Sequence, residues 1–161
     1  MNPAFDTFRQ KITNPVKLRL FMLKSLPAAF FAGLRIRALD KDHCAVSVRY
    51  KWFNKNPFRS MYFAVQAMAA EMSTGLLASG NIYKREPRLS MLVTGIEAKF
   101  VKKVTGLAVF SCTDGTAIDQ AIGEAIATGE SRTIACRSTG TNSEGETVSE
   151  FVVTWSFKVK R

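Results

Sequence analysis

The chain has 161 residues, 47% of them hydrophobic and 22% charged, which suits one packed domain and excludes a disordered chain. Its formal net charge of +10 is unevenly distributed, because residues 1–103 hold 18 Lys or Arg and 6 Asp or Glu. Such an excess indicates partners such as phosphates, an anionic membrane or nucleic acid, and says nothing about the fold.

Several kinds of site are excluded by missing residue types. The three cysteines, Cys44, Cys112 and Cys136, lie far apart without a C-x-x-C pair, so neither a disulfide framework nor a structural zinc site is indicated. The single histidine, His43, excludes a site with two histidine ligands, and no P-loop, G-x-S-x-G or dinucleotide-binding spacing occurs. We therefore expect no metal and no cofactor, and an enzyme built this way would use carboxylates, amides and backbone N–H groups.

The N-terminal 15 residues contain an early acid and no continuous apolar run, so no secretory signal is expected and a cytoplasmic location follows as an expectation. Residues 60–80 form the longest apolar-rich stretch but include Gln66 and Glu71. Since a lipid-exposed span rarely carries a central Glu, this stretch is interpreted as a helix buried in protein.

Residues 15–26 are predicted to form a short amphipathic helix that begins at Pro15. Its apolar residues at helical spacing are expected to face the core: Val16, Leu20, Leu23 and Leu26. Lys17 and Lys24 lie outside this stripe, which leaves an alternative in which the helix contacts an anionic membrane surface.

A period of two follows, and it predicts a hairpin of strands 34–39 and 43–52 around the turn at 40–42. Cys44, Val46, Val48, Tyr50 and Trp52 are expected to share one buried face. After a loop at 54–58, a long helix is predicted over 60–79, ended by Gly80 and Asn81.

The second half is predicted to be mostly strand. The expected strands are 89–104 with a bend at Gly95, 106–113, 131–140, and 147–160 with a core face of Phe151, Val153, Trp155, Phe157 and Val159. A short helix over 117–128, capped at Asp114, and a hairpin turn at 142–145 complete the pattern. The sequence thus predicts one α+β domain over 1–161, an antiparallel sheet of about six strands wrapped around helix 60–79.

Glu71 is the only formally charged residue between Arg59 and Lys84. Its helical neighbours Ala67, Thr74 and Gly75 are small, so its carboxylate is expected to lie in a shallow recess. Burial raises the pKa of a carboxyl that lacks hydrogen bonds, and clefts use this arrangement for a general base. The alternative is a structural Glu that pairs with a Lys or with the backbone.

The start of the same helix offers backbone donors. Free N–H groups near Ser60 and Met61 are expected to stabilise an oxyanion or a bound anion. Asn56 and Ser60 are equally consistent with ordinary loop and cap residues, and Gln66 with a packed amide.

Two basic clusters follow the helix, at 84–88 and at Lys99, Lys102 and Lys103. They are consistent with a solvated face or with recognition of phosphates on a substrate such as coenzyme A. Nucleic acid is the weaker interpretation, because no binding motif appears and aromatic residues do not alternate with the charges.

Three segments together resemble the hot-dog superfamily of thioesterase-like proteins: NPFRSMYFAVQAMAAEMSTGLLASG at 56–80, EAKFVKKVTG at 97–106 and the N-x-x-G-E hairpin at 142–146. The resemblance covers about 15–160. It is nearest to a branch known as a domain of unknown function, which also occurs fused to bacterial acetyltransferases.

The resemblance implies a dimer or a dimer of dimers that binds an acyl-CoA or acyl-carrier thioester between subunits. It implies that Glu71, within an acid-x-small-x-Gly pattern ending at Gly75, activates water or attacks the thioester. Asn56 then lies near the thioester, and Ser60 and Met61 replace the usual His-Gly-Gly turn of the oxyanion hole. Substrate contacts are expected from Gln66, Lys99, Lys102 and Lys103.

The resulting hypothesis is an acyl-CoA thioesterase that hydrolyses a medium- or long-chain acyl thioester with Glu71. The alternative is a non-catalytic acyl-CoA or lipid-binding protein with its basic N-terminal region near a membrane. Hydratase chemistry ranks low, because that activity usually needs a His in the site and His43 lies on a predicted strand.

Overall fold

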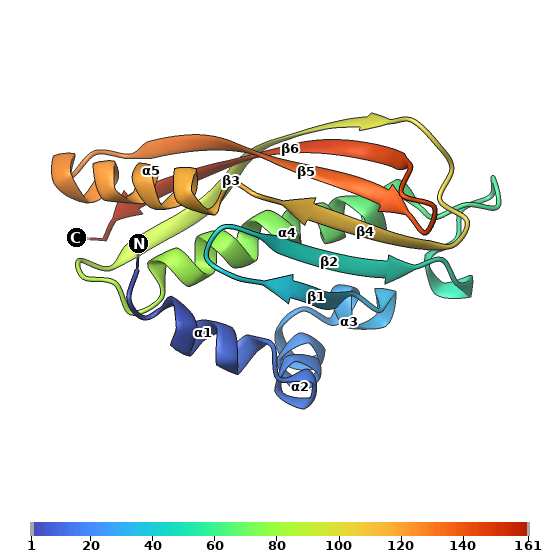
Figure 1. The fold of residues 1–161 in the computed structure, drawn as a ribbon, viewed down its shortest axis with the longest axis horizontal. Coiled ribbons are helices and arrows are strands. Elements are labelled where there is room, and N and C mark those ends of the chain that lie inside the picture. The colour runs from blue at the N-terminus through green and yellow to red at the C-terminus, as the bar shows by residue number, and fades with distance from the viewer. Residues whose placement is uncertain (1, 161) are drawn as a thin grey trace.

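The computed structural model describes residues 2–160, so residues 1 and 161 of the predicted domain lie outside the described residues. A six-stranded antiparallel sheet in the order β1-β2-β4-β5-β6-β3 packs along the long helix α4 (Figure 1). The elements are α1 Phe5–Ile12, α2 Pro15–Ser25, α3 Pro27–Ala32, β1 Arg35–Leu39, β2 Cys44–Arg49, η1 Trp52–Asn54, α4 Phe63–Ile82, β3 Leu89–Phe100, β4 Leu107–Cys112, α5 Gly115–Thr128, β5 Arg132–Asn142 and β6 Thr147–Val159. This arrangement confirms the predicted α+β architecture.

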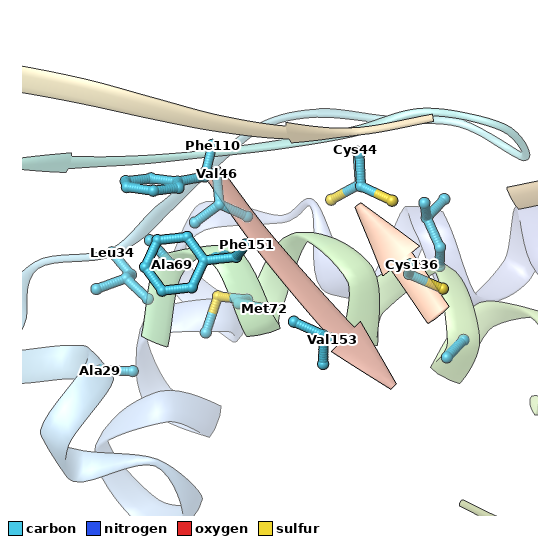
Figure 2. Packing of buried hydrophobic residues seen from close by; sticks show 14 of the residues in the cluster. Ala29, Leu34, Cys44, Val46, Ala69, Met72, Phe110, Cys136, Phe151 and Val153 are labelled. Atoms are coloured by element: carbon cyan, nitrogen blue, oxygen red, sulfur yellow. The ribbon is translucent and has the colours of Figure 1, made fainter. Parts of the chain in front are cut away.

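The core lies between α4 and the sheet, as expected for a helix that is apolar on nearly all sides. Figure 2 shows Phe110, Phe151 and Val153 of the sheet over Ala69 and Met72 of α4. The rings of Phe110 and Phe151 meet edge to face with centroids 5.9 Å apart. The cysteines are free and buried in this core, and burial raises the pKa of Cys112 to about 12.

Helix α4 begins three residues later and ends three residues later than predicted. Its predicted start is instead a loop in which Arg59 has φ 59° and Met61 bridges to Lys55. Gly80, predicted to end the helix, is needed for packing, since a Cβ there would lie 2.4 Å from the Phe5 ring. The helix therefore continues through Gly80 to Ile82. The prediction that Gly80 ends the helix is wrong, because this glycine is required by packing and not by a change of backbone direction.

Helix α2 confirms the prediction of a short helix but faces the other way. Its buried residues are Leu18 and Met22, whereas the expected core stripe is exposed: Val16 66%, Leu20 63%, Leu23 47% and Leu26 44%. The helix is apolar on both sides, so spacing alone could not decide which side packs. The short helices α1 and α3, which the sequence did not predict, flank α2 and contact it.

Trp52 lies outside the sheet, contrary to prediction. Strand β2 ends at Arg49, and Trp52 begins η1 with 79% of its surface exposed. Residues Cys44–Val48 are buried on both faces, so β2 does not show the alternation that the sequence suggested.

Helix α5 is capped by a residue distant in sequence. Asp114 occupies the N-cap position, but its carboxylate accepts the Arg137 N–H at 2.7 Å. Asp42 Oδ1, from the β1–β2 turn, instead accepts the Thr116 N–H at 2.8 Å. Gly115 permits this approach, because a Cβ there would lie 2.0 Å from the Lys41 carbonyl oxygen.

Strand β3 pairs with β6 along its whole length and forms one edge of the sheet. The pairing shifts between Val93 and Gly95, which confirms the predicted irregularity. Beyond this bulge the strand is exposed, including Ile96 at 48% and Phe100 at 47%. The other edge of β3 has no partner strand within the described residues.

Candidate active site

Glu71 projects from the middle of α4 into a pocket of about 190 Å³. The pocket lies under the N-terminal helices and against β3 and β6; its lining is Phe8, Ile12, Leu18, Phe21, Met22, Leu26, Glu71, Met72, Gly75, Leu76, Ser79, Met91 and Trp155. Glu71 is the only ionisable residue of this lining. We refer to it as the Glu71 pocket.

The carboxylate of Glu71 lies over Gly75, one helical turn later. A Cβ at residue 75 would lie 3.1 Å from Glu71 Oε1 and 3.1 Å from Trp155 Cζ2, so any larger residue would press on both groups and make them shift by a few tenths of an ångström. The Trp155 ring is held in turn, because its Nε1 donates to Thr74 Oγ1 at 2.9 Å. Glycine and tryptophan thus define where the carboxylate can lie.

The carboxylate makes no hydrogen bond and no ion pair with the residues that the structure describes, 2–160. Desolvation by burial raises the pKa of Glu71 above its ordinary value of 4.5. A lone carboxylate in an apolar pocket is thereby a stronger base than one in water. The arrangement suits proton abstraction from water or from another weak acid.

A second pocket of about 530 Å³ lies at the start of α4. It contains most of the other sequence-predicted site residues: Asn56, Ser60, Met61, Gln66, Lys102 and Lys103. We refer to it as the helix-start pocket. The two pockets share no lining residue, so within one chain Glu71 is not brought together with Asn56.

The oxygen of Asn56 organises its own loop. Asn56 Oδ1 accepts the N–H of Phe58 at 3.0 Å and the N–H of Ser60 at 3.2 Å. The amide nitrogen Nδ2 has no acceptor within the described residues and is the part of Asn56 available to a ligand.

The N–H groups of Ser60 and Met61 are both engaged, in contrast to the expected oxyanion role. Ser60 N–H donates to Asn56 Oδ1, and Met61 N–H donates to the Val104 carbonyl at 2.8 Å. Because α4 starts later than predicted, the N–H groups of Phe63 and Ala64 are the ones without an acceptor in the described part of the chain.

The amide of Gln66 is buried and satisfied. Its Oε1 accepts the Ser149 hydroxyl at 2.9 Å, and its Nε2 donates to the Met61 carbonyl at 3.4 Å. This corresponds to the packed-amide alternative that the sequence left open.

The three lysines at the end of β3 differ in their surroundings. Lys102 Nζ pairs with Glu146 Oε1 at 2.5 Å, and Lys103 Nζ donates to the Phe58 carbonyl at 3.5 Å. Lys99 is exposed opposite Glu150 on β6 and does not line the helix-start pocket. Glu146 is the last residue of the N-x-x-G-E hairpin that carried the family resemblance, but it was not predicted to be a site residue.

Sequence reasoning missed the residues that make the Glu71 pocket apolar. Phe8, Ile12 and Phe21 come from α1 and α2, far from Glu71 in the chain. Their apolar character was visible in the sequence, but nothing there indicated that these helices fold over α4. Among the helices in residues 2–160, none combines the length and apolar character needed to traverse a bilayer.

Comparison with known proteins places this geometry in context. Residues 18–157 match a family described as "Domain of unknown function (DUF4442)". No curated protein matches the chain.

Solved structures share the fold at low sequence identity. The Pseudomonas aeruginosa protein PA5026, described as a probable thioesterase, is 20% identical, with 93% of this chain and 99% of that chain covered at a TM-score of 0.75. A protein of unknown function from Chlorobaculum tepidum is 18% identical, with 90% and 94% covered at a TM-score of 0.75. The thioesterase HI1161 of Haemophilus influenzae is 16% identical, with 87% and 88% covered at a TM-score of 0.62. The fold is therefore the hot-dog fold of thioesterase-like proteins.

Proposed function

The chain belongs to the DUF4442 family and has the hot-dog fold, and from this premise we propose that it hydrolyses acyl thioesters, with acyl-CoA as the substrate class. The observation that carries the proposal is Glu71, a single carboxylate that has no partner among residues 2–160 and lies in an otherwise uncharged apolar pocket. Such a pocket would receive an acyl chain, and such a carboxylate would activate a water molecule next to the thioester carbonyl at the end of that chain.

In the proposed reaction Glu71 is the general base. Its carboxylate takes a proton from a water molecule while the water oxygen bonds to the thioester carbonyl carbon. The C–S bond then breaks, and the proton on Glu71 passes to the leaving thiolate. Direct attack by Glu71 would expel the thiolate and form an anhydride instead, and attack of ¹⁸O-water on the Glu71 carbonyl of that anhydride would leave label in Glu71 after a single turnover.

The pocket volume favours a medium chain. An apolar cavity of about 150 Å³ holds benzene, so about 190 Å³ accommodates roughly seven or eight carbon atoms. The contacts of Phe8, Phe21 and Met91 with the chain would set the optimum length.

The active form that we propose is a homodimer through the edge of β3. Met91 lines the Glu71 pocket and Phe100 lines the helix-start pocket, and both lie on β3. Antiparallel pairing of two β3 strands about Gly95 and Ile96 would set Met91 of one protomer opposite Phe100 of the second. The Glu71 pocket of each protomer would then adjoin the helix-start pocket of the other.

In this dimer the helix-start pocket supplies the polar contacts that the Glu71 pocket lacks. The N–H groups of Phe63 and Ala64 would hold the thioester oxygen, with Asn56 Nδ2 beside them. Lys99, Lys102 and Lys103 would contact coenzyme phosphates. Gln66 would act by fixing the Met61 carbonyl and Ser149.

The test begins with native mass spectrometry of the purified protein, which detects any bound acyl ligand. The protein is then incubated with acyl-CoA esters of roughly 4 to 16 carbons, and the release of free thiol is measured. We expect thiol release with an optimum near eight carbons and its loss in Glu71→Gln. Glu124→Gln, on the exposed side of α5, is the matched control. Retained acyl ligand without thiol release would instead assign the protein to non-catalytic acyl binding.

The composite site has its own test. Glu71→Gln and Lys102→Glu/Lys103→Glu proteins, each of which we expect to be inactive, are mixed and allowed to exchange subunits. Heterodimers that contain one intact composite site would regain part of the activity. No recovery, with exchange confirmed by mass spectrometry, would overturn the shared site while leaving hydrolysis by Glu71 intact.

A further inference from the structure

Helix α2 carries apolar residues on the side that faces away from the protein. Leu18 and Met22 are buried, and Leu20, on the opposite side of the helix, is 63% exposed. Val16 at 66% and Leu23 at 47% lie beside Leu20 at helical spacing. A soluble surface helix normally places polar residues there, so this stripe requires an occupant.

Exposed aromatic residues lie on the elements that follow α2 in this packing. Helix α2 packs on α3, and α3 packs on η1. Phe31 of α3 is 51% exposed, and its ring lies 5.9 Å from that of Phe53, which is 50% exposed. Trp52 beside them is 79% exposed. Aromatic side chains of this kind partition to the boundary between lipid and water.

The charges on the chain segments that form this surface are all of one sign. Residues 7–39 contain seven Lys or Arg and no Asp or Glu, and residues 43–59 contain four and none. Lys17 and Lys24 border the apolar stripe on α2, and neither is in an ion pair with a residue in the described range 2–160. Their long apolar stems allow the ammonium groups to reach phosphates while the stripe is buried.

We propose that the exposed stripe of α2, together with Phe31, Trp52 and Phe53, docks this protein on an anionic phospholipid bilayer. Apolar residues that enter the headgroup region, flanked by unpaired lysines, give peripheral attachment by two additive contributions. A second copy of the chain is disfavoured as the occupant, because a symmetric contact would bring the same cations together.

The attachment would place the Glu71 pocket next to lipid. Leu18, Phe21 and Met22 of α2 line that pocket, so the helix that contacts the bilayer also covers the acyl-binding space. An acyl thioester that partitions into the bilayer would then have a short route into the pocket. The docking itself does not depend on hydrolysis by Glu71.

The experiment is co-sedimentation of the full chain with vesicles of phosphatidylcholine alone and of phosphatidylcholine with phosphatidylglycerol. We expect binding only to the anionic vesicles, weakened by added salt. Val16→Ser/Leu20→Ser/Leu23→Ser and Lys17→Glu/Lys24→Glu should each lower the partition coefficient, the charge variant by roughly 30-fold or more. Lys158→Glu/Lys160→Glu makes an equal change of net charge near the end of β6 and is the control. Its partition coefficient should fall much less.

Circular dichroism and hydrolysis of a short-chain substrate without vesicles would confirm that the variants fold, since none of these residues lines the Glu71 pocket. If Lys17→Glu/Lys24→Glu and Lys158→Glu/Lys160→Glu lowered vesicle binding equally, binding would depend on net charge alone, and the proposal would be overturned. Absence of vesicle binding would do the same. Self-association that the triple Ser variant abolishes, without vesicle binding, would assign the stripe to a second copy.

Discussion

The two pockets along α4 differ in what their polar atoms are bonded to. In the helix-start pocket, Asn56 Oδ1 and both polar atoms of the Gln66 amide already have partners in the same chain. In the Glu71 pocket the carboxylate has none among the described residues, and the walls are apolar. Unsatisfied polarity in an apolar site is expensive for stability, so it indicates function more strongly than polar composition does.

The largest difference between the pockets should appear in turnover. Glu71→Gln keeps the size of the side chain but removes the base, so we expect kcat to fall by about 10²- to 10⁴-fold. Steady-state thiol release with a medium-chain acyl-CoA measures this, with Glu124→Gln as the control. A kcat unchanged by Glu71→Gln would remove the functional distinction between the two pockets.

Gly75→Ala should give the next largest effect. The added Cβ would press on Glu71 Oε1 and on the Trp155 ring, each 3.1 Å away, and displace the carboxylate from its position. We expect kcat to fall by about 10- to 100-fold, because small misplacements of a reacting group are costly.

The matched control for Gly75→Ala is Gly123→Ala on α5, where an added Cβ would meet nothing within 4 Å. Both variants replace a helical glycine by alanine, so both gain the same helix propensity and a comparison of the two removes that contribution. A normal kcat in Gly75→Ala would show that the carboxylate position is not restricted by its neighbours.

Asn56→Ala should affect stability first. Loss of the Oδ1 acceptor leaves the N–H groups of Phe58 and Ser60 without their partner, which should lower the free energy of unfolding by about 1–2 kcal/mol. Denaturant titration measures this. Asn56→Asp keeps the acceptor and should stay close to wild type in stability, so a loss of turnover in Asn56→Asp would reveal a role for Nδ2.

The smallest effect concerns pH. The pKa of Glu71 is raised in the folded state, so its contribution to stability is fully present below the unfolded pKa and is lost as pH rises through the folded pKa. Glu71→Gln should therefore melt at a higher temperature than wild type at about pH 7.5, where Glu71 is charged, and at a similar temperature at about pH 4, where Glu71 is protonated.

The same shift predicts that the acid limb of kcat/KM lies above the ordinary Glu value of 4.5. Thermal unfolding at the two pH values and a pH–rate profile check these expectations. A Glu71→Gln variant that melts below wild type at about pH 7.5 and at a similar temperature at about pH 4 would show the opposite sign and would indicate a carboxylate stabilised in its charged form.

Sequence patterns predicted those features whose cause is local. The alternation in β6 correctly assigned Phe151, Val153, Trp155 and Phe157 to the core, because the alternate residues from Thr154 to Lys158 are polar; Val159, at the end of the strand, is only partly buried. The isolation of Glu71 among small neighbours pointed to a recess, and the structure has Gly75 beneath the carboxylate.

Features whose cause lies elsewhere in the chain were not predictable in this way. Both sides of α2 are apolar, so its orientation depends on contacts with α1, α3 and the Glu71 pocket. The cap of α5 comes from Asp42, 74 residues away, and Asn56 with Arg59 delays the start of α4. Each outcome depends on a tertiary partner that local spacing does not specify.

The bulge in β3 has a consequence for how the chain tolerates changes in length. Partners on β6 show that Met91 and Val93 share a face with Phe157 and Trp155, whereas after the bulge Ile96 and Ala98 share it with Val153 and Phe151. The positions that share the face of Phe151 and Trp155 therefore change from odd to even at Thr94. Deleting one residue elsewhere in β3 would turn the rest of the strand inside out, but deletion of Thr94 would restore a continuous alternation. Homologues that differ in length within this strand should accordingly place their gap at this position.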